Sequence, residues 1–347
     1  MGRARAGLLA ASLLALAVIL LPWIEQTPTV GGEGDALPRV LIAGHSSNPD
    51  EPYHGGLLEF ARIVEERSEG RLRVEVYPSG QLGSERMMIE GLLLGTIDIV
   101  VAANGSASSF VPELAVLDLP FLFDDREHMF RVLDGEVGET LRASASKRGF
   151  RILAYLDAGV RHIMTRSRPL ERLDDLRGLK IRTMPVPTHL DAFDAFGAQA
   201  IALNYGEVYG SLQTGLIDGA EAANTNFTRK NFYEVAPNWA QVGWIILVAN
   251  MMMSESALAA LPADLREIIH EAAEVAADHE RLLYRESDEA LLERIREIGV
   301  NVTYPDPAPF RAVAEQVYQQ RMQSPSEQAL LRAIRAEAVM GASAEED

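Results

Sequence analysis

The sequence predicts an α/β protein with two lobes joined by a hinge. Strand and helix patterns alternate between residues 39 and 102, and a second alternation of the same kind begins near residue 151. Such an order gives a largely parallel sheet with helices on both faces. An unbroken helical pattern from 262 to 298 indicates, in addition, one helix long enough to span both lobes.

The first lobe is expected to have the order β-α-β-α-β. Alternating apolar and polar side chains predict strands, and apolar residues near a period of 3.6 predict helices. Serine caps one helix, and glycine ends both. The expected elements are strand Arg39–Ala43, helix Pro52–Glu69 ended by Gly70, strand Leu72–Tyr77, a helix between Ser84 and Gly95, and strand Ile97–Ala102.

The second lobe is expected to repeat this pattern after a switch near Asp157–Gly159. No repeat of the sequence itself is visible between the two lobes. The expected strands are Arg151–Tyr155, His162–Met164, Lys180–Arg182 and Gln199–Leu203, with helices over residues 188–196 and 206–214.

A very long helix is expected to begin at Pro262, because proline suits the first helical position, and to end at Ile298 before Gly299. About 36 residues at about 1.5 Å each span about 54 Å, whereas a small domain is about 30 Å across. A continuous helix would therefore extend beyond one lobe. The alternative is two helices with a break near Asp278–His279.

Residues 1–37 are predicted to be an export signal followed by a linker. Arg3 and Arg5 precede an apolar run from Gly7 to Leu21, which is the order of a signal peptide. Extended to Ile24, the run reaches about 18 residues, close to the length of a spanning helix, and no clear cleavage site follows. We expect a periplasmic protein, either released or held by an uncleaved N-terminal anchor.

The composition argues against several classes of function. Acidic residues outnumber basic ones by 50 to 32, and a net charge of -18 argues against nucleic acid and anionic membranes as partners. The absence of cysteine removes disulfides, thiol nucleophiles and cysteine zinc sites. The 7 histidines show no metal-binding spacing, and no phosphate-binding, dinucleotide or nucleophile motif occurs. We therefore expect no metal, no cofactor and no catalytic residue.

Arg182 is the most informative single residue. It ends a short predicted strand that Pro185 stops, since proline cannot donate to a sheet ladder. Ligands of open α/β sheets bind at the carboxyl ends of strands, and the guanidinium fork matches a carboxylate. Arg182 therefore predicts a small organic anion as ligand. The alternative is a structural salt bridge to Asp174 or Asp175.

Six sequence blocks in a fixed order resemble one known family. It is the periplasmic solute-binding subunits of tripartite ATP-independent periplasmic (TRAP) transporters, of the dicarboxylate-binding-protein type. The similarity covers nearly all of the chain after the signal. The blocks are Val74–Glu85, Leu94–Asp98, Leu117–Phe123, Gly159–His162, Asp175–Arg182 and Glu207–Gly219.

The resemblance implies a type II-like periplasmic binding protein whose two lobes close over one ligand. Lobe I would comprise residues 38–158 with 248–286, and lobe II residues 159–247 with 287–347. The resemblance also implies that the protein delivers its ligand to membrane-embedded permease subunits. In the family, an arginine at the position of Arg182 pairs with the ligand carboxylate, and one at the position of Arg161 lies near the ligand. For Arg161 the alternative is an ion pair in the hinge.

One segment departs from the family pattern. Many members read Gln-Glu-Asn-Pro after the block that ends at Gly219, whereas this chain reads Ala220-Glu221-Ala222-Ala223-Asn224. The ligand-facing asparagine is therefore absent at Ala222 or shifted to Asn224. Further candidate ligand contacts, each with a structural alternative, are Asn104, Glu85, Glu221, His45, Glu51, Tyr53 and Trp244.

These observations predict a monomeric extracytoplasmic protein that binds an organic acid. Candidate polar side chains around the arginine would suit hydroxyl groups, so a sugar acid or hydroxy acid is favoured over a plain dicarboxylate. Two other functions remain open. One is a ligand-sensing subunit for a membrane kinase, which an uncleaved anchor would favour. The other is an extracytoplasmic enzyme on the same fold, which would need a cluster of acid, base or metal ligands that the sequence does not show.

Overall fold

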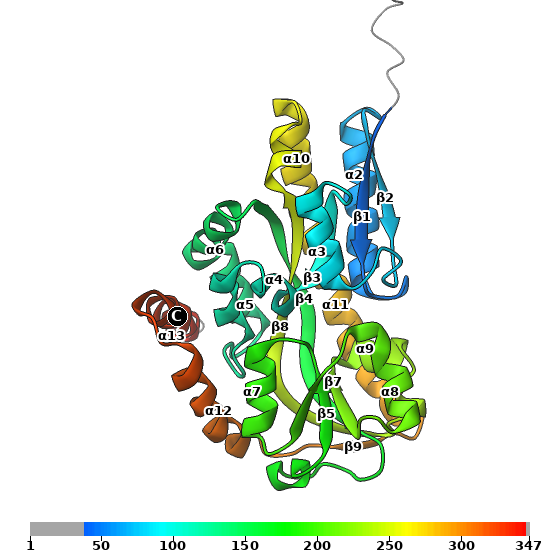
Figure 1. Ribbon diagram of the computed structural model, residues 1–347, viewed down its shortest axis with the longest axis vertical. Coiled ribbons are helices and arrows are strands. Elements are labelled where there is room, and N and C mark those ends of the chain that lie inside the picture. The colour runs from blue at the N-terminus through cyan, green and yellow to red at the C-terminus, as the bar shows by residue number, and fades with distance from the viewer. Residues whose placement is uncertain (1–37, 345–347) are drawn as a thin grey trace, which may run out of the picture. The chain divides into compact units, whose positions relative to one another are not determined.

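One mixed sheet of nine strands forms the centre of the computed structural model, which describes residues 38–344 (Figure 1). The strand order is β2-β1-β3-β8-β4-β7-β5-β6, and β9 pairs with β8. The predicted export signal lies outside the described residues. Within residues 38–344, no helix combines the length and the apolar character needed to cross a membrane.

The first part of the chain forms a β-α-β-α-β unit, here called the first module, as predicted. Ser84 caps α3 by accepting a hydrogen bond from the Met87 amide, and Gly95 ends it in the left-handed conformation. The parallel strands β2, β1 and β3 lie side by side. The elements are β1 Arg39–His45, α2 Pro52–Arg67, β2 Leu72–Tyr77, α3 Glu85–Leu94 and β3 Ile99–Ala103.

A second β-α-β-α-β unit, the second module, has the same topology. Its parallel strands take the order β6-β5-β7, which matches β2-β1-β3 of the first module. Its elements are β5 Lys180–Thr183, α7 Pro187–Ala195, β6 Gln199–Ala202, α8 Val208–Thr214 and β7 Gly219–Ala222.

The two modules share a short turn motif, although no repeat of greater length accompanies it in the sequence. Gly95-Thr96-Ile97-Asp98 and Gly215-Leu216-Ile217-Asp218 occupy the same turn before the third strand of each module. Both glycines are left-handed, with φ of 71° and 76°. Asp98 accepts a hydrogen bond from the Ile42 amide at 2.8 Å, and Asp218 accepts one from the Lys180 amide at 2.9 Å. Each aspartate thus ties this turn to the first strand of its own module.

Two long antiparallel strands connect the modules. They are β4, Phe150–Thr165, and β8, Asn238–Ser254. β4 replaces two strands that the sequence analysis separated at Asp157–Gly159. The chain does not leave the sheet there, because a shift of register between Asp157 and Val160 absorbs Gly159, whose φ is 82°. β8 was not predicted as one strand, because it is buried on both faces over most of its length and shows no alternation.

The predicted long helix is continuous. α11, Ala263–Glu297, has 35 residues and no break at Asp278–His279. Pro262 is its N-cap residue, one position before the predicted place. α11 packs against α2 of the first module, against β4, and against α9, Asn224–Arg229, which follows the second module. It therefore runs from the first module to the helix that follows the second module (Figure 1).

Further helices and one short strand fill the connections and the chain end, and the sequence analysis did not predict them. They are α4 Asn104–Ser108, the 3-10 helix η2 Pro112–Asp118, α5 Arg126–Asp134, α6 Glu136–Ser146, the 3-10 helices η3 Leu173–Leu176, η4 Tyr205–Glu207 and η5 Phe232–Glu234, α10 Glu255–Ala259, β9 Asn301–Thr303, α12 Ala308–Arg321 and α13 Pro325–Ala344.

Candidate ligand-binding site

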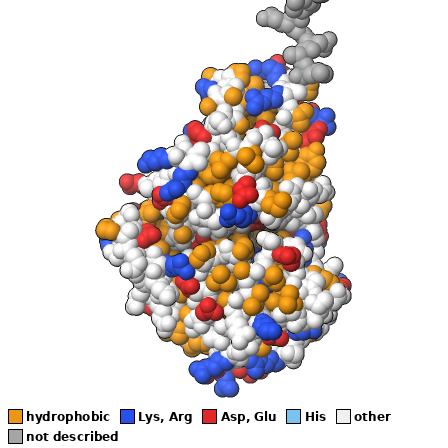
Figure 2. Space-filling view, in the orientation of Figure 1, with side chains coloured by type: hydrophobic (Ala, Val, Ile, Leu, Met, Phe, Trp, Pro, Cys, Tyr) orange, Lys and Arg blue, Asp and Glu red, His pale blue; other side chains and the backbone are white. Residues whose placement is uncertain are grey.

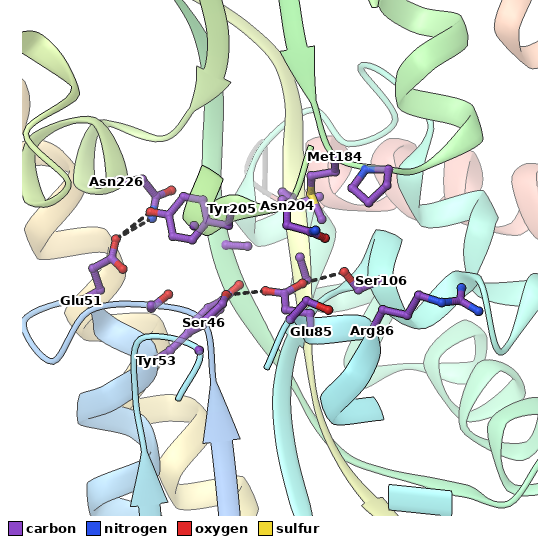
Figure 3. A pocket seen from close by; sticks show the side chains of 18 of the residues that line it. Ser46, Glu51, Tyr53, Glu85, Arg86, Ser106, Met184, Asn204, Tyr205 and Asn226 are labelled. Carbon is purple, nitrogen blue, oxygen red and sulfur yellow. Dashed lines mark hydrogen bonds between the residues drawn. The ribbon is translucent and has the colours of Figure 1, made fainter. Parts of the chain in front are cut away.

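A cavity of about 360 Å³ lies between the two modules. Its walls are the segments that follow β1, β2, β3, β5, β6 and β7, together with residues of β4 and β8 and Tyr284 of α11. These segments meet because the carboxyl ends of the parallel strands in both modules face the space between them. In Figure 3, Glu51, Glu85 and Ser106 of the first side face Met184, Tyr205 and Asn226 of the second.

Arg161 and Arg182 meet at the cavity and share one carboxylate. Glu221, at the third position of β7, accepts a hydrogen bond from Arg161 Nε at 2.7 Å and one from Arg182 Nη1 at 3.1 Å. All three side chains are buried. The alternative partners of Arg182 are wrong, because Asp174 pairs with Arg177 and Asp175 with Arg172.

The three buried groups stay charged and carry one excess positive charge. Burial alone would raise the pKa of Glu221, but Arg161 and Arg182 hold it below its usual value. Burial also opposes the charge on Arg161, but Glu221 outweighs it and the pKa is raised. Burial, with a contribution from Arg161, lowers the pKa of Arg182 from a very high usual value. Two cations and one anion leave a single positive charge within this group of three side chains.

Arg182 retains donors for a ligand. A guanidinium has five N–H donors, and those of Arg182 make three bonds to described residues. Nε and Nη2 donate to the carbonyl of Leu203 at 3.0 and 2.8 Å, and Nη1 donates to Glu221. Five donors minus three leaves two, one on each terminal nitrogen. Each of the two could donate a charge-assisted hydrogen bond to a ligand carboxylate.

Arg161 is used more fully by the protein itself. Besides Glu221, it donates to Asn226 Oδ1 at 2.8 Å and, with longer bonds, to the carbonyls of Ala158 and Glu221. It therefore fixes Glu221 and Asn226 more than it offers donors to a ligand. The alternative of an ion pair is present in the contact with Glu221, and a role of Arg161 near the ligand stays a prediction.

The first module contributes an acceptor opposite the arginines. Glu85, at the first position of α3, accepts hydrogen bonds from Ser46 at 2.7 Å and Ser106 at 2.6 Å (Figure 3). Two hydroxyl groups thereby hold the carboxylate in one orientation at the cavity wall. A carboxylate oxygen can accept more than one hydrogen bond, so Glu85 suits ligand hydroxyl groups.

Glu51 connects the two sides of the cavity. It accepts hydrogen bonds from Tyr205 Oη at 2.9 Å and Asn226 Nδ2 at 3.0 Å, both beyond the switch, and from the amide of Asn48 at 2.6 Å. Figure 3 shows the bond to Asn226 across the cavity. Glu51 is only 2 % exposed, so its carboxylate is hydrogen-bonded by protein groups rather than by water. The loop after β1 is therefore tied directly to the second side.

Three tyrosines complete the wall as neutral hydrogen-bonding groups. Burial raises the pKa of Tyr53, Tyr205 and Tyr284 well above the usual value. Tyr284 donates to the carbonyl of Ala158 at 3.0 Å. The Tyr53 hydroxyl makes no hydrogen bond to any residue in the described range, and it lines the cavity. It is thus available to a ligand.

The predicted site residues fall into two groups. Arg182, Arg161, Glu85, Glu51 and Tyr53 line the cavity. Glu221 lies directly behind the two arginines. The remaining four, Asn104, His45, Asn224 and Trp244, lie outside the cavity lining.

Asn104 and His45 were expected to contact a ligand, but other polar groups surround them. Asn104 is fully buried and donates to Asp118 and to the carbonyl of Leu114, both at 2.9 Å. His45 is absent from the cavity lining and contacts His54, with 3.1 Å between Nε2 and Nδ1. Burial lowers the pKa of His45 to about 3, so the ring is neutral.

Asn224 and Trp244 were also expected at the ligand and take structural positions. Asn224 accepts hydrogen bonds from Trp239 Nε1 at 2.9 Å and Gln241 Nε2 at 2.8 Å. Trp244 packs edge-on against His189 and Phe193, which agrees with the alternative of core packing. Ala222, the other position considered for an asparagine, belongs to the buried core of the second module.

Asn226 of α9 lines the cavity, and the sequence analysis missed it. Asn204, Tyr205, Ser46 and Ser106 were missed as well. All follow the carboxyl end of a strand by one to four residues. The rule that identified Arg182, applied to every strand, would have found them.

Within the described part of the chain, no three His, Asp or Glu side chains gather in a way that could hold a metal ion. Besides the two arginines, the cavity lining contains Glu51, Glu85 and Arg86, so its chemistry is that of hydrogen bonds and several charged side chains. Two α/β modules around such a cavity define a solute-binding protein.

The chain belongs to the bacterial extracellular solute-binding protein family 7, whose sequence model matches residues 43–324. This family comprises the solute-binding subunits of TRAP transporters, so the predicted resemblance is confirmed.

Three relatives illustrate the similarity. A solute-binding protein of Chromohalobacter salexigens is 33% identical over 276 residues, 79% of this chain and 82% of that protein. The 2,3-diketo-L-gulonate-binding periplasmic protein of Escherichia coli is 30% identical over 262 residues, 76% and 80% of the two chains. A TRAP periplasmic solute-binding protein from Sulfitobacter, solved with bound β-D-galacturonate, has a TM-score of 0.84 at 28% identity and covers 86% of this chain and 100% of its own.

Proposed function

We propose that this chain captures a monomeric sugar acid in the periplasm and delivers it to a TRAP permease. The observation that carries the proposal is the pair of unused donors on Arg182, a residue that lines the cavity. The ligand carboxylate would accept both donors. Its hydroxyl groups would face Glu85, which Ser46 and Ser106 hold in place, and the free hydroxyl of Tyr53.

The size of the cavity supports a ligand of this kind. A volume of about 360 Å³ corresponds to about 12 water molecules at about 30 Å³ each. That is close to the number of non-hydrogen atoms in a hexuronic acid. Two relatives point the same way, since one holds galacturonate and another is described as binding 2,3-diketo-L-gulonate.

The arginine alone cannot supply the affinity. A charge-assisted hydrogen bond contributes about 1.5–3 kcal/mol, whereas micromolar binding needs about 8 kcal/mol. The remaining contacts and the exclusion of water must provide the rest. Closure of the two modules over the ligand would provide both, and it requires that the ligand bind the closed state better than the open one.

A thermal-shift series with matched ligands tests the proposal. D-galacturonate, D-glucuronate and D-galactonate should raise the melting temperature of the protein, whereas neutral D-galactose should not. Arg182→Gln should abolish the shift for every acid, and Arg177→Gln, on an exposed side chain, should leave it intact. Equal stabilisation by D-galactose and by D-galacturonate would contradict the proposal.

A further inference from the structure

A second cluster of polar side chains is buried behind the cavity, and the ligand contacts do not use it. Asp118, the last residue of η2, is fully buried. One of its oxygens accepts a hydrogen bond from Asn104 at 2.9 Å, and the other, Oδ2, has no partner within the described residues. A charged carboxylate with an unpaired buried oxygen is unfavourable.

His189 of α7 faces Asp118 from the second module. The distance from Nε2 to Asp118 Oδ1 is 3.8 Å, which is too long for a hydrogen bond. Neither ring nitrogen of His189 has a partner among residues 38–344, and Trp244 packs edge-on against the ring at 5.0 Å between centroids. Trp244 Nε1 and Asn250 Oδ1 are also buried without partners. The contact between the two sides thus buries several unpaired polar atoms around one carboxyl.

The modules approach each other closely beside this cluster. A side chain added at Gly105 of α4 would come within 2.3 Å of Val186, the residue before α7. α7 also packs against η2. Separation of the two modules would therefore remove α7 from η2 and admit water to Asp118.

We propose that Asp118 takes up one proton from solvent when the two modules close over a sugar acid, because closure places the carboxyl under His189 and Trp244. This inference rests on the proposed function. The proton neutralises the carboxyl and gives it an O–H to donate in a space that holds unpaired acceptors. Sugar-acid binding is thereby coupled to pH through a residue that does not touch the ligand.

The electrostatics of the cluster support this direction. Burial raises the pKa of Asp118 to about 7, and only Asn104 and Ser108 act against it. His189 is the titratable group that faces Asp118, whereas α4 and β8 present uncharged Asn104, Ser108 and Asn250. No charged group of α6 or α13, which also pack on η2, shifts this pKa.

His189 itself does not take the proton near neutral pH. Burial lowers its pKa to about 4, with Glu221 acting to raise it and Arg161 and Arg182 to lower it further. A ligand carboxylate bound to Arg182 adds a negative charge on the side of the second module, to which His189 also belongs. That charge favours the protonated form of the neighbouring groups.

The sign of the pH effect follows from the raised pKa. An aspartate open to water has a pKa of about 3.9, whereas burial in the described structure, which we take as the closed form, raises the pKa of Asp118 to about 7. Closure is therefore favoured by acid, and this advantage is lost as the pH rises toward 7. Affinity for the sugar acid should fall by up to about tenfold per pH unit between these values and be constant above them.

Isothermal titration with D-galacturonate at pH 6.0, in two buffers of different ionisation enthalpy, measures the proton directly. Wild type should take up about 0.9 proton per ligand. Asp118→Asn, which retains the acceptor for Asn104, should take up none. Asp278→Asn, on a side chain that is 83% exposed, should match wild type.

The outcomes separate the two proposals. Binding of D-galacturonate without proton uptake, or with uptake unchanged in Asp118→Asn, would overturn the role of Asp118 alone. No binding at all would overturn the proposed function and this inference with it.

A measurement on wild type alone covers the case in which Asp118→Asn does not fold. The dissociation constant for D-galacturonate should rise roughly fifty- to hundredfold from pH 5 to pH 8, with little change above pH 7.5. A dissociation constant that is constant over this range would refute the coupling.

Discussion

Asn224 and Asn226 show how far two neighbouring and chemically identical residues can differ in role. Both are buried, and both lie in the first turn of α9. Asn224 joins Trp239 and Gln241 in the core, whereas Asn226 bridges Arg161 and Glu51 at the cavity. Their spacing of two residues places the side chains on different faces of the helix.

Replacing each asparagine by alanine should therefore give opposite results. Asn224→Ala leaves the Trp239 indole N–H unpaired in the core, which costs about 1–3 kcal/mol of unfolding free energy, with little effect on D-galacturonate affinity. Asn226→Ala should weaken D-galacturonate binding by tenfold or more, because Arg161 and Glu51 lose the group that orders them.

Urea unfolding of both variants measures the unfolding free energy, and titration with D-galacturonate measures the affinity. Each variant is the control for the other. Equal loss of affinity in the two would show that Asn226 has no special place at the cavity.

At the scale of the element, Gly159 determines the path of β4 between the modules. Its φ is 82°, and a side chain there would come within 2.5 Å of Ala223 and 2.7 Å of Tyr284. The position therefore needs glycine for its backbone and for its space. Gly178 shares the left-handed backbone, with a φ of 74°, but has open space around it.

Alanine substitutions at Gly178 and Gly159 distinguish the cost of a strained backbone from the cost of crowding. Gly178→Ala should lower the unfolding free energy by about 1–2 kcal/mol, the cost of a left-handed alanine. Gly159→Ala should cost a further 1–3 kcal/mol or so, the usual cost of overpacking. Denaturant unfolding of both variants measures the difference, and equal losses would mean that Tyr284 and Ala223 yield without cost.

Local elements were predictable where one stretch of sequence determines them. Ser84 and Gly95 bound α3 as expected, and the unbroken pattern of α11 gave its full length. β4 was divided at Gly159, since a glycine in a strand reads as an interruption when its pairing partner is unknown. That partner, β8, lies about ninety residues further along the chain.

At the scale of the whole molecule, the site could be predicted only in part. Arg182 and Glu85 lie at ends of elements, so the topology alone places them at the cavity. Asn104 also follows a strand, yet Asp118 and Asn250 engage its side chain. Partners so distant in sequence are set by tertiary packing, which a strand-end rule does not include. The Asp118–His189 contact depends on both modules for the same reason.

The charge of the whole chain should affect the rate of binding. The net charge is -18, and Figure 2 shows acidic and basic side chains interspersed over the face in view. A sugar acid thus approaches through a repulsive field and meets an attractive charge only at the cavity. Salt screens the long-range field more than short contacts in a buried site.

Raising the salt concentration from 10 to 150 mM should therefore accelerate the association of D-galacturonate, by roughly two- to threefold, while the dissociation rate changes little. Stopped-flow tryptophan fluorescence gives both rates. A slower association at 150 mM would indicate that the local arginine charge dominates the approach.

The continuity of β4 and β8 has a consequence for how this protein could change over generations. Under the proposed closure, both strands must bend together, so their stiffness sets the fraction of molecules ready to close. Apparent affinity scales with that fraction for every ligand alike. Substitutions along the two strands could thus retune sensitivity to scarce or abundant nutrient without altering which nutrient is chosen, a choice left to the cavity wall.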